Sequence, residues 1–129
     1  MKYVYPVVFS PDADGFCVYA PDLPGCVTEA ADYADGIGKI REGLCGMLYI
    51  LERDGMPVPL PSDPLAVERE ADDLVSLVDI DTDAYKRRVG SRAVRRTISI
   101  PEWMDDLASQ TGVSLSQITQ EALRRHLHV

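Results

Sequence analysis

The first twenty residues carry an apolar pattern typical of β-structure. Lys2–Phe9 (KYVYPVVF) is rich in the β-branched and aromatic residues that favour a pleated sheet. The turn formers of Pro11–Gly15 (PDADG) follow, and Phe16–Ala20 (FCVYA) resumes the apolar pattern. We therefore predict a β-hairpin at the start of the chain.

The period of the apolar residues then changes from that of a strand to that of a helix. Cys26–Ala30 predicts a third strand, after which apolar residues recur every three or four positions. Asp32 is a suitable N-cap and Gly55 a suitable C-terminal stop, so we predict a helix over Tyr33–Asp54. Its apolar face comprises Ile37, Ile40, Leu44, Met47, Leu48 and Leu51. Four glycines weaken this helix, and close packing against the sheet would explain them: Gly36, Gly38, Gly43 and Gly46.

One further strand completes the N-terminal module. Met56–Pro64 holds four prolines and is predicted to be an exposed connection, and Leu74–Ile80 (LVSLVDI) is the last strand. The order β-β-β-α-β predicts an α+β domain over residues 1–81, with the helix layered on the sheet.

A short alternating strand opens the C-terminal part of the chain. Within Ala93–Ile100 the two isoleucines fall on one face, and Arg95, Thr97 and Ser99 fall on the other. A strand that stands alone leaves its main-chain groups without hydrogen-bond partners. This strand therefore needs a partner that the rest of the module does not supply.

Two amphipathic helices are predicted after this strand. Pro101 suits the first position of one helix and Gly112 suits its end, while Ser114 and Gln117 have capping-box spacing at the start of the other. One strand and two helices in under 40 residues cannot bury enough apolar surface alone. We therefore predict that residues 93–129 form an obligate homodimer, in which the strand pairs with its copy in an antiparallel ribbon.

Such a ribbon fits the major groove of DNA, where Arg95, Thr97 and Ser99 can contact base edges. The start of the last helix, near Ser114, directs N–H groups outward and can hold a phosphate. The predicted DNA-binding residues are Arg92, Arg95, Arg96, Thr97, Ser99, Ser114, Ser116 and Gln117.

The distribution of charge supports two modules with different partners. The formal net charge of −8 would argue against a nucleic-acid partner if it were spread evenly. Residues 1–85 hold 17 acidic and 5 basic residues, a net charge of −12, whereas residues 86–129 carry +4. Six basic residues lie between Lys86 and Arg96 without an intervening acid. We predict a basic linker over residues 82–92 between an acidic module and a DNA-binding module.

Little in the sequence points to catalysis. The three cysteines are an odd number without metal-type spacing, and neither a membrane span nor an export signal is present, so we expect reduced thiols and a cytoplasmic protein. Asp79, Asp81 and Asp83 recur at period 2 and could share a strand face, and Asp12 and Asp14 make a second acidic pair, but no third source of carboxylates and no general base is apparent. We expect no enzymatic activity, no cofactor and no metal.

The run RRTISIPEWMDDLASQTGVSLSQITQEALRRHL resembles the ribbon-helix-helix family of DNA-binding proteins over nearly all of the last 38 residues. The alternating strand, the proline at the helix start and the Gly-x-Ser turn carry this resemblance. It implies that Arg95, Thr97 and Ser99 are the base-contacting residues.

The N-terminal module resembles the HicB antitoxins in its YPVVF strand, its DGF hairpin exit, its PDLPGC loop, its helix ending near ERDGMPVP and its VSLVDID strand. The glycine-rich helix departs from the family pattern. The resemblance implies a partial RNase H-like fold and a type II antitoxin that binds a basic HicA-like mRNA interferase and represses its own operon. The loop residues Asp22, Leu23, Pro24 and Gly25 are either a toxin contact or a tight strand connection.

The leading hypothesis is a non-enzymatic antitoxin and autorepressor that dimerises through its C-terminal module. Whether N-terminal modules also associate, giving a tetramer, is left open. One alternative is a ribbon-helix-helix regulator whose N-terminal domain senses a ligand. Another is an active RNase H-like nuclease.

Overall fold

The computed structural model describes residues 1–129, which form two compact units, Met1–Arg92 and Ala93–Val129. The first unit holds a sheet and two α-helices, and the second holds two α-helices. No helix of the chain is both long enough and apolar enough to cross a membrane.

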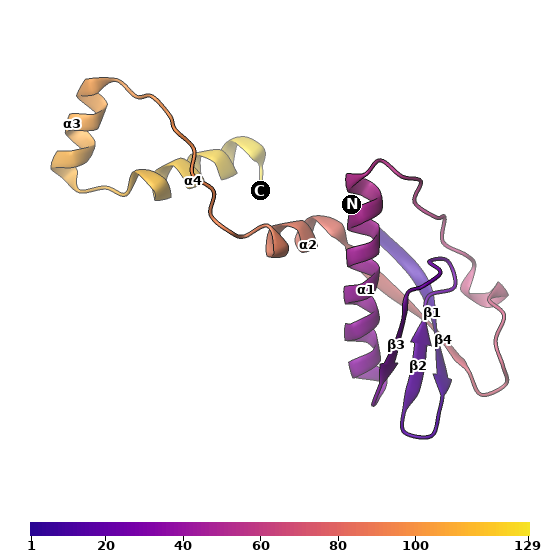
Figure 1. The fold of residues 1–129 in the computed structure, drawn as a ribbon. Coiled ribbons are helices and arrows are strands. Elements are labelled where there is room, and N and C mark those ends of the chain that lie inside the picture. The colour runs from indigo at the N-terminus through magenta and orange to yellow at the C-terminus, as the bar shows by residue number, and fades with distance from the viewer. The chain divides into compact units, whose positions relative to one another are not determined.

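The first unit contains a four-stranded antiparallel sheet (Figure 1). Its strands are β1 (Lys2–Pro11), β2 (Phe16–Tyr19), β3 (Val27–Ala30) and β4 (Leu74–Asp81). The spatial order is β3-β2-β1-β4, so β1 pairs with both β2 and β4, and β3 and β4 are the edge strands. The strands predicted over the first unit from the apolar pattern are confirmed, with bounds that differ by one or two residues.

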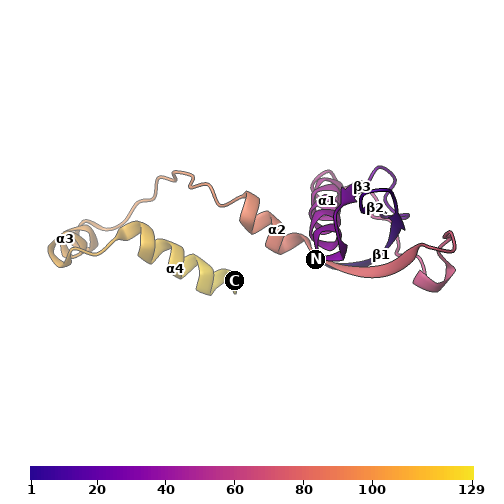
Figure 2. The ribbon, with the colours of Figure 1, turned by 90° about the horizontal axis from the view of Figure 1, so that it is seen from below.

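The long helix α1 (Tyr33–Arg53) covers one face of this sheet (Figure 2). Both predicted ends are confirmed: a side-chain oxygen of Asp32 accepts a hydrogen bond from the Asp35 N–H at 2.8 Å, and Gly55 has φ +65°. Alternate residues of the strands pack against the apolar face of α1. The centre of this core comprises Tyr5, Val7, Phe9, Val18, Ile40, Leu44, Leu48, Val78 and Ile80.

Close packing explains some of the helix glycines and not others. A Cβ atom on Gly36 would lie 2.5 Å from Cε1 of Phe9, which is closer than real Cβ atoms approach, and one on Gly43 would lie 3.3 Å from Sγ of Cys26. A Cβ atom on Gly38 would meet nothing within 4 Å. Gly36 is therefore required by the contact between the helix and the sheet, whereas Gly38 is not.

The segment between α1 and β4 is mostly irregular and exposed, as its prolines indicate. Its one regular element is the short 3-10 helix η1 (Pro64–Ala66), which contacts β4. The phenol of Tyr5 donates a hydrogen bond to the carbonyl of Pro59, so the first part of the segment is held against the sheet.

The structure corrects the predicted linker at residues 82–92. Thr82–Val89 forms a helix, α2, which directly follows β4 and contacts α1. Asp81 caps it by accepting hydrogen bonds from the N–H groups of Asp83 and Ala84 at 3.0 and 3.2 Å. The basic segment is therefore largely part of the first unit, because its helix packs on that unit.

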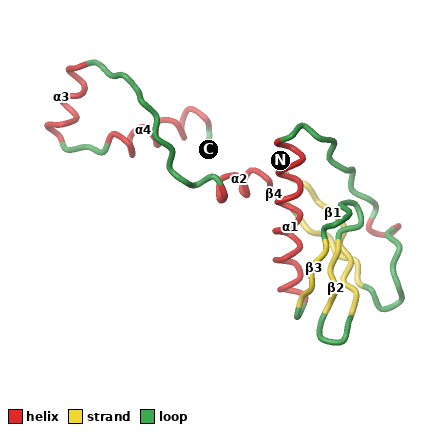
Figure 3. Tube along the Cα trace, in the orientation of Figure 1, coloured by secondary structure: helices red, strands yellow, loops and turns green.

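The second unit consists of α3 (Glu102–Thr111) and α4 (Leu115–Leu127) after an irregular segment (Figure 3). Gly112 has φ +68° and ends α3, and the hydroxyl of Ser114 accepts a hydrogen bond from the Gln117 N–H at 3.3 Å, as the sequence predicts. Pro101 stands one residue earlier than predicted, at the N-cap of α3. The strand predicted over residues 93–100 is not formed in the single chain, where it has no strand to pair with.

Candidate functional site

The predicted base-contacting residues lie together in the irregular segment that opens the second unit. Arg95, Thr97 and Ser99 alternate with apolar residues there, and all three side chains are exposed. Ile98 and Ile100, predicted for the opposite face, are 62% and 39% exposed. The segment therefore presents both faces to solvent in a single chain.

The second unit has no core of its own. None of its residues is buried, and only Ala108 and Thr119 are partly buried. Apolar side chains of α3 and α4 are exposed instead, among them Trp103, Met104, Leu107, Leu115, Ile118, Leu123 and Leu127. Apolar stripes on two helices ordinarily pack against each other or against another chain. The single copy leaves both stripes without a partner.

The other predicted DNA contacts fall in two places. Ser114, Ser116 and Gln117 lie at the start of α4 and are exposed, although the Gln117 N–H is already bonded to the Ser114 hydroxyl. Arg92 ends the first unit, and Arg96 lies beside Arg95 in the second. Both arginines are exposed and form no ion pair.

The boundary at residue 92 changes the distribution of charge. Because Lys86, Arg87, Arg88 and Arg92 belong to the first unit, that unit carries a net charge of −8 and the second carries none. The net +4 predicted for the C-terminal module was therefore wrong for the folded unit. The second unit therefore offers local arginines, and no net positive charge, to the DNA partner predicted from the sequence.

Two of the basic side chains on α2 pair with acidic side chains on α1. Nζ of Lys86 lies 3.3 Å from Oε2 of Glu52, and Arg88 pairs with Glu42. The Tyr85 ring lies 5.6 Å from the Tyr49 ring, and the Arg88 guanidinium lies 5.3 Å from the centre of the Tyr85 ring. These contacts hold α2 on α1 and leave Arg87 as the unpaired arginine in the helix.

Glu52 connects three elements of the first unit. Its Oε1 atom accepts hydrogen bonds from the Tyr3 phenol at 2.7 Å and from the Thr82 hydroxyl at 2.9 Å. Burial raises the pKa of the Glu52 carboxyl, but hydrogen bonds from Tyr3, Thr82 and Lys86 outweigh burial and hold it below its usual value. The same bond with Glu52, helped by burial, raises the pKa of Tyr3 to about 12. The junction of β1, α1 and α2 is thus a closed hydrogen-bond network.

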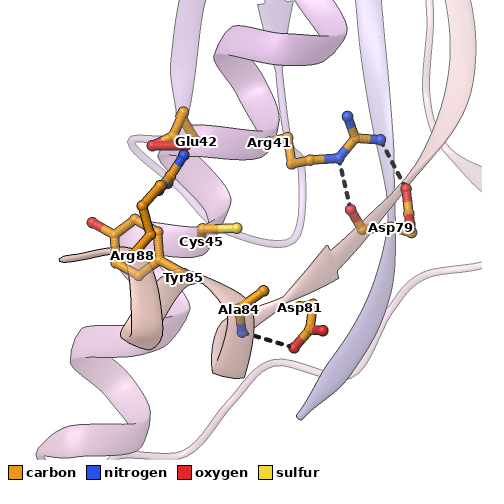
Figure 4. Close-up of a pocket in the computed structure, with 8 residues that line it drawn as sticks. All are labelled: Arg41, Glu42, Cys45, Asp79, Asp81, Ala84, Tyr85 and Arg88. Carbon is orange, nitrogen blue, oxygen red and sulfur yellow. Dashed lines mark hydrogen bonds and ion pairs between the residues drawn. The ribbon is translucent and has the colours of Figure 1, made fainter. Parts of the chain in front are cut away.

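A surface cavity of about 270 Å³ lies between α1, β4 and α2 (Figure 4). Figure 4 shows the Arg41 side chain turned toward Asp79 and the Arg88 side chain turned toward Glu42. Burial raises the pKa of the Cys45 thiol, which also lines this cavity. The charged groups around the cavity are therefore already paired or hydrogen-bonded, and burial disfavours the thiolate form of Cys45.

The three aspartates considered for two-metal chemistry do not converge. Asp79 pairs with Arg41, Asp81 caps α2, and Asp83 lies in the first turn of α2. No group of three or more His, Cys, Asp or Glu side chains is arranged to hold a metal ion. Each of these carboxylates has a structural role within the first unit.

Two of the four predicted toxin-contact residues in the PDLPG loop, Asp22 and Leu23, make contacts within the first unit. Leu23 is 2% exposed and belongs to the core, and the Asp22 carboxylate accepts hydrogen bonds from the N–H and hydroxyl of Ser62. Pro24 and Gly25 are exposed. Toxin contact by this loop remains a prediction, and these two residues are the ones free to make it.

Sequence reasoning missed the contacts of α2 and one face of the sheet. The missed face carries exposed Val4, Val27 and Leu77. The signal that could have identified it is that β1 is apolar both at its odd positions, which face α1, and at its even positions, which face away.

Comparison with known families gives a match over most of the chain. A family model described as the HicB_like antitoxin of bacterial toxin-antitoxin system matches residues 5–123, which span both units. No curated protein matches the chain.

Several solved structures have a similar fold. A chain of a toxin-antitoxin complex from Streptococcus pneumoniae is 22% identical, with a TM-score of 0.62 over 98% of this chain and 99% of that one. The antitoxin HicB of Burkholderia pseudomallei is 22% identical, with a TM-score of 0.55 over 94% and 96% of the two chains. A chain of a HicA3 and HicB3 toxin-antitoxin complex is 26% identical, with a TM-score of 0.51 over 61% of this chain and 99% of that one.

Proposed function

This chain belongs to the HicB-like antitoxin family of bacterial toxin-antitoxin systems, and from that premise we propose a division of labour between its two units. The first unit neutralises a HicA-like mRNA interferase by binding it directly. The second unit forms a ribbon-helix-helix dimer that represses the operon. The protein acts in the cytoplasm, as a binding protein rather than an enzyme.

The family match that spans both units is the observation that carries this proposal. The similar structure of HicA3 with HicB3 supports a HicA-like toxin as the protein partner, because that relative is part of such a complex. The net charge of −8 on the first unit also suits a basic RNA-cutting partner. Complementary charge speeds association and disfavours wrong partners.

The exposed apolar stripes of α3 and α4 support dimerisation of the second unit. A second copy would bury Leu107, Ile118 and Leu123, which a single copy leaves about half exposed. It would also supply the strand that residues 93–100 need, so that two copies form the two-stranded ribbon. Folding of this unit is then coupled to dimerisation, as in other obligate dimers.

In this dimer the ribbon would present Arg95, Thr97 and Ser99 twice, in the arrangement that reads a palindromic site in the major groove. Ser114, Ser116 and the start of α4 would hold a backbone phosphate. Because the second unit is electrically neutral, Arg92, Arg95 and Arg96 must supply the local attraction to DNA.

Arg95→Ala separates the two activities. The variant should lose binding to the promoter fragment that precedes its own gene, because a base contact and a charge are removed together. Growth rescue from a co-expressed HicA-like toxin should be unaffected. Gel-shift titration and growth curves measure these two outcomes.

Lys2→Ala is the matched control, since Lys2 is exposed, forms no ion pair and lies in the first unit. It should change neither activity. Loss of toxin neutralisation by a folded Arg95→Ala protein would contradict the division of labour. Failure of the unmodified protein to protect cells from the toxin would contradict the antitoxin function itself.

A further inference from the structure

The basic residues at the end of the first unit do not all have partners. Two basic side chains of α2, Lys86 and Arg88, pair with acidic side chains of α1, and Figure 4 shows this for Arg88. Arg87 and Arg92 are exposed and form no ion pair. The first unit therefore keeps two free guanidinium groups where it joins the second.

Arg87 lies on the side of α2 that faces away from α1. The Tyr85 ring packs on α1, and Arg88, three positions later, also contacts α1. Arg87 is two positions after Tyr85, which is about 200° round the helix axis. Asp83, one turn earlier, lies 2.8 Å from the Met1 nitrogen and forms no ion pair with Arg87. Docking of α2 thus holds an unpaired guanidinium on its solvent side.

A short stretch of chain joins Arg87 to the residues predicted to contact bases. Arg95 follows Arg87 by eight residues, and residues 90–100 form no helix or strand. A fully extended chain spans at most about 3.6 Å per residue, so the two Cα atoms lie less than about 29 Å apart. One turn of DNA is about 34 Å long. Arg87 therefore stays within one turn of DNA from Arg95 in every arrangement of the two units.

The run of chain that joins the two units is free of acids. Residues 84–101 hold six basic residues and no acidic residue. The first unit as a whole carries a net charge of −8, and the four arginines of the second unit are balanced by four acids. A phosphate backbone is repelled by a net negative charge and attracted by local unpaired cations. The acid-free run is therefore the part of the first unit suited to approach DNA.

We propose that Arg87 contacts a backbone phosphate in the DNA that flanks the site read by Arg95, Thr97 and Ser99. The inference rests on the proposed function and adds a DNA contact outside the ribbon-helix-helix unit. A guanidinium matches the geometry of a phosphate, and phosphate contacts fix a protein on the duplex without reading its sequence. The first unit then takes part in operator binding through a helix that is already in place.

Arg87→Ala in the full chain tests the proposal. Binding to the promoter fragment is measured by fluorescence anisotropy at several salt concentrations. Each phosphate contact contributes about 0.9 to the slope of log affinity against log salt concentration, so a dimer that loses two contacts should show a slope shallower by about 1.8. Arg87→Lys keeps the positive charge and should retain most of the slope.

The length of the DNA locates the contact. On a fragment trimmed to the half-sites that the C-terminal strands read, the flanking phosphates are missing, and Arg87→Ala should bind as the unmodified protein does. Lys2→Ala is the matched control, since it removes one exposed and unpaired positive charge from the same unit. It should keep the full slope on the longer fragment.

The possible results separate the contact from other roles of Arg87. An unchanged slope in Arg87→Ala on the longer fragment would overturn the proposed contact and leave the proposed function intact. An equal loss in Lys2→Ala would assign the effect to net charge, and weaker toxin neutralisation with unchanged DNA binding would assign Arg87 to the toxin. Either result overturns the proposal. An unmodified protein that binds neither fragment would overturn the proposed DNA-binding function itself.

Discussion

Arg41 on α1 makes two hydrogen bonds to Asp79 at the edge of the sheet. Its Nη2 atom lies 2.8 Å from Oδ1 of Asp79, and its Nε donates to the Asp79 main-chain carbonyl at 3.0 Å. On the opposite edge strand, Nζ of Lys39 donates to the carbonyl of Glu29 at 3.1 Å. Helix α1 thus places a positively charged side chain on a main-chain carbonyl of each edge strand, β3 and β4. Charged side chains at the edge of a sheet hinder pairing of the edge strand with a strand of another chain.

Arg41→Ala should increase aggregation through the exposed β4 edge. Light scattering during slow heating should rise earlier than for the unmodified protein. The midpoint of chemical unfolding should change little, because an ion pair between two largely exposed side chains contributes little stability. Arg53→Ala is the control, since Arg53 pairs with its neighbour Asp54 and touches no strand edge. Equal scattering from the two variants would show that Arg41 does not protect the edge.

Gly36→Ala and Gly38→Ala should change stability in opposite directions. The new methyl at position 36 would press on the buried Phe9 ring, and we expect a loss of about 1–3 kcal/mol in the free energy of unfolding. At position 38 the methyl meets open space, so the better helix propensity of alanine should add up to about 1 kcal/mol. Urea denaturation measures both. The same sign for both variants would contradict the packing of α1 on the sheet.

Tyr85→Ala tests whether α2 is part of the first unit. Loss of the partly buried ring that packs against Tyr49 should lower the free energy of unfolding by roughly 1–3 kcal/mol. Arg87→Ala should change it little, because Arg87 lies on the same helix and forms no ion pair. A free linker would tolerate both substitutions equally, and that result would exclude the docked helix.

Stability should fall in alkali because of Tyr3. The Tyr3 pKa rises from 10.0 to about 12 in the folded chain, chiefly because the phenol donates a hydrogen bond to Glu52. The unfolded chain therefore loses this proton first as the pH rises. The contribution is fully present below about pH 10 and is lost as the pH approaches about 12.

Tyr3→Phe removes this contribution, so its unfolding free energy should vary less steeply between these two pH values. Burial also raises the pKa of Tyr5 and of Tyr19, and the difference between variant and unmodified protein isolates Tyr3. Identical pH profiles would show that the bond between Tyr3 and Glu52 does not stabilise the fold.

Much of the local structure follows from the sequence. The apolar periods locate the four strands and α1, and the caps at Asp32, Gly112 and Ser114 form as predicted. These features depend on residues within one or two turns of each other, so neighbouring positions in the chain are enough to specify them. The exact ends of the strands do not follow from composition, because pairing with the neighbouring strand sets where each strand ends.

The roles of several charged side chains do not follow from the sequence. The run from Lys86 to Arg96 has the pattern of a basic linker, yet two of its side chains pair with Glu52 and Glu42, more than thirty residues away. Asp79 has the spacing of a metal ligand and instead accepts hydrogen bonds from Arg41. The pattern of charges along the sequence does not show which oppositely charged side chain lies nearby in the folded chain.

The sequence by itself thus determined the four strands of the sheet, the helices α1, α3 and α4 and the family, because periodicity, capping and motif order are local or linear properties. Only the tertiary structure decided that β4 lies beside β1, that α2 packs on α1 and that the second unit is electrically neutral. It also decided that Leu23 of the PDLPG loop belongs to the core. These properties arise from contacts between residues far apart in the chain, whose energies depend on burial and pairing in space.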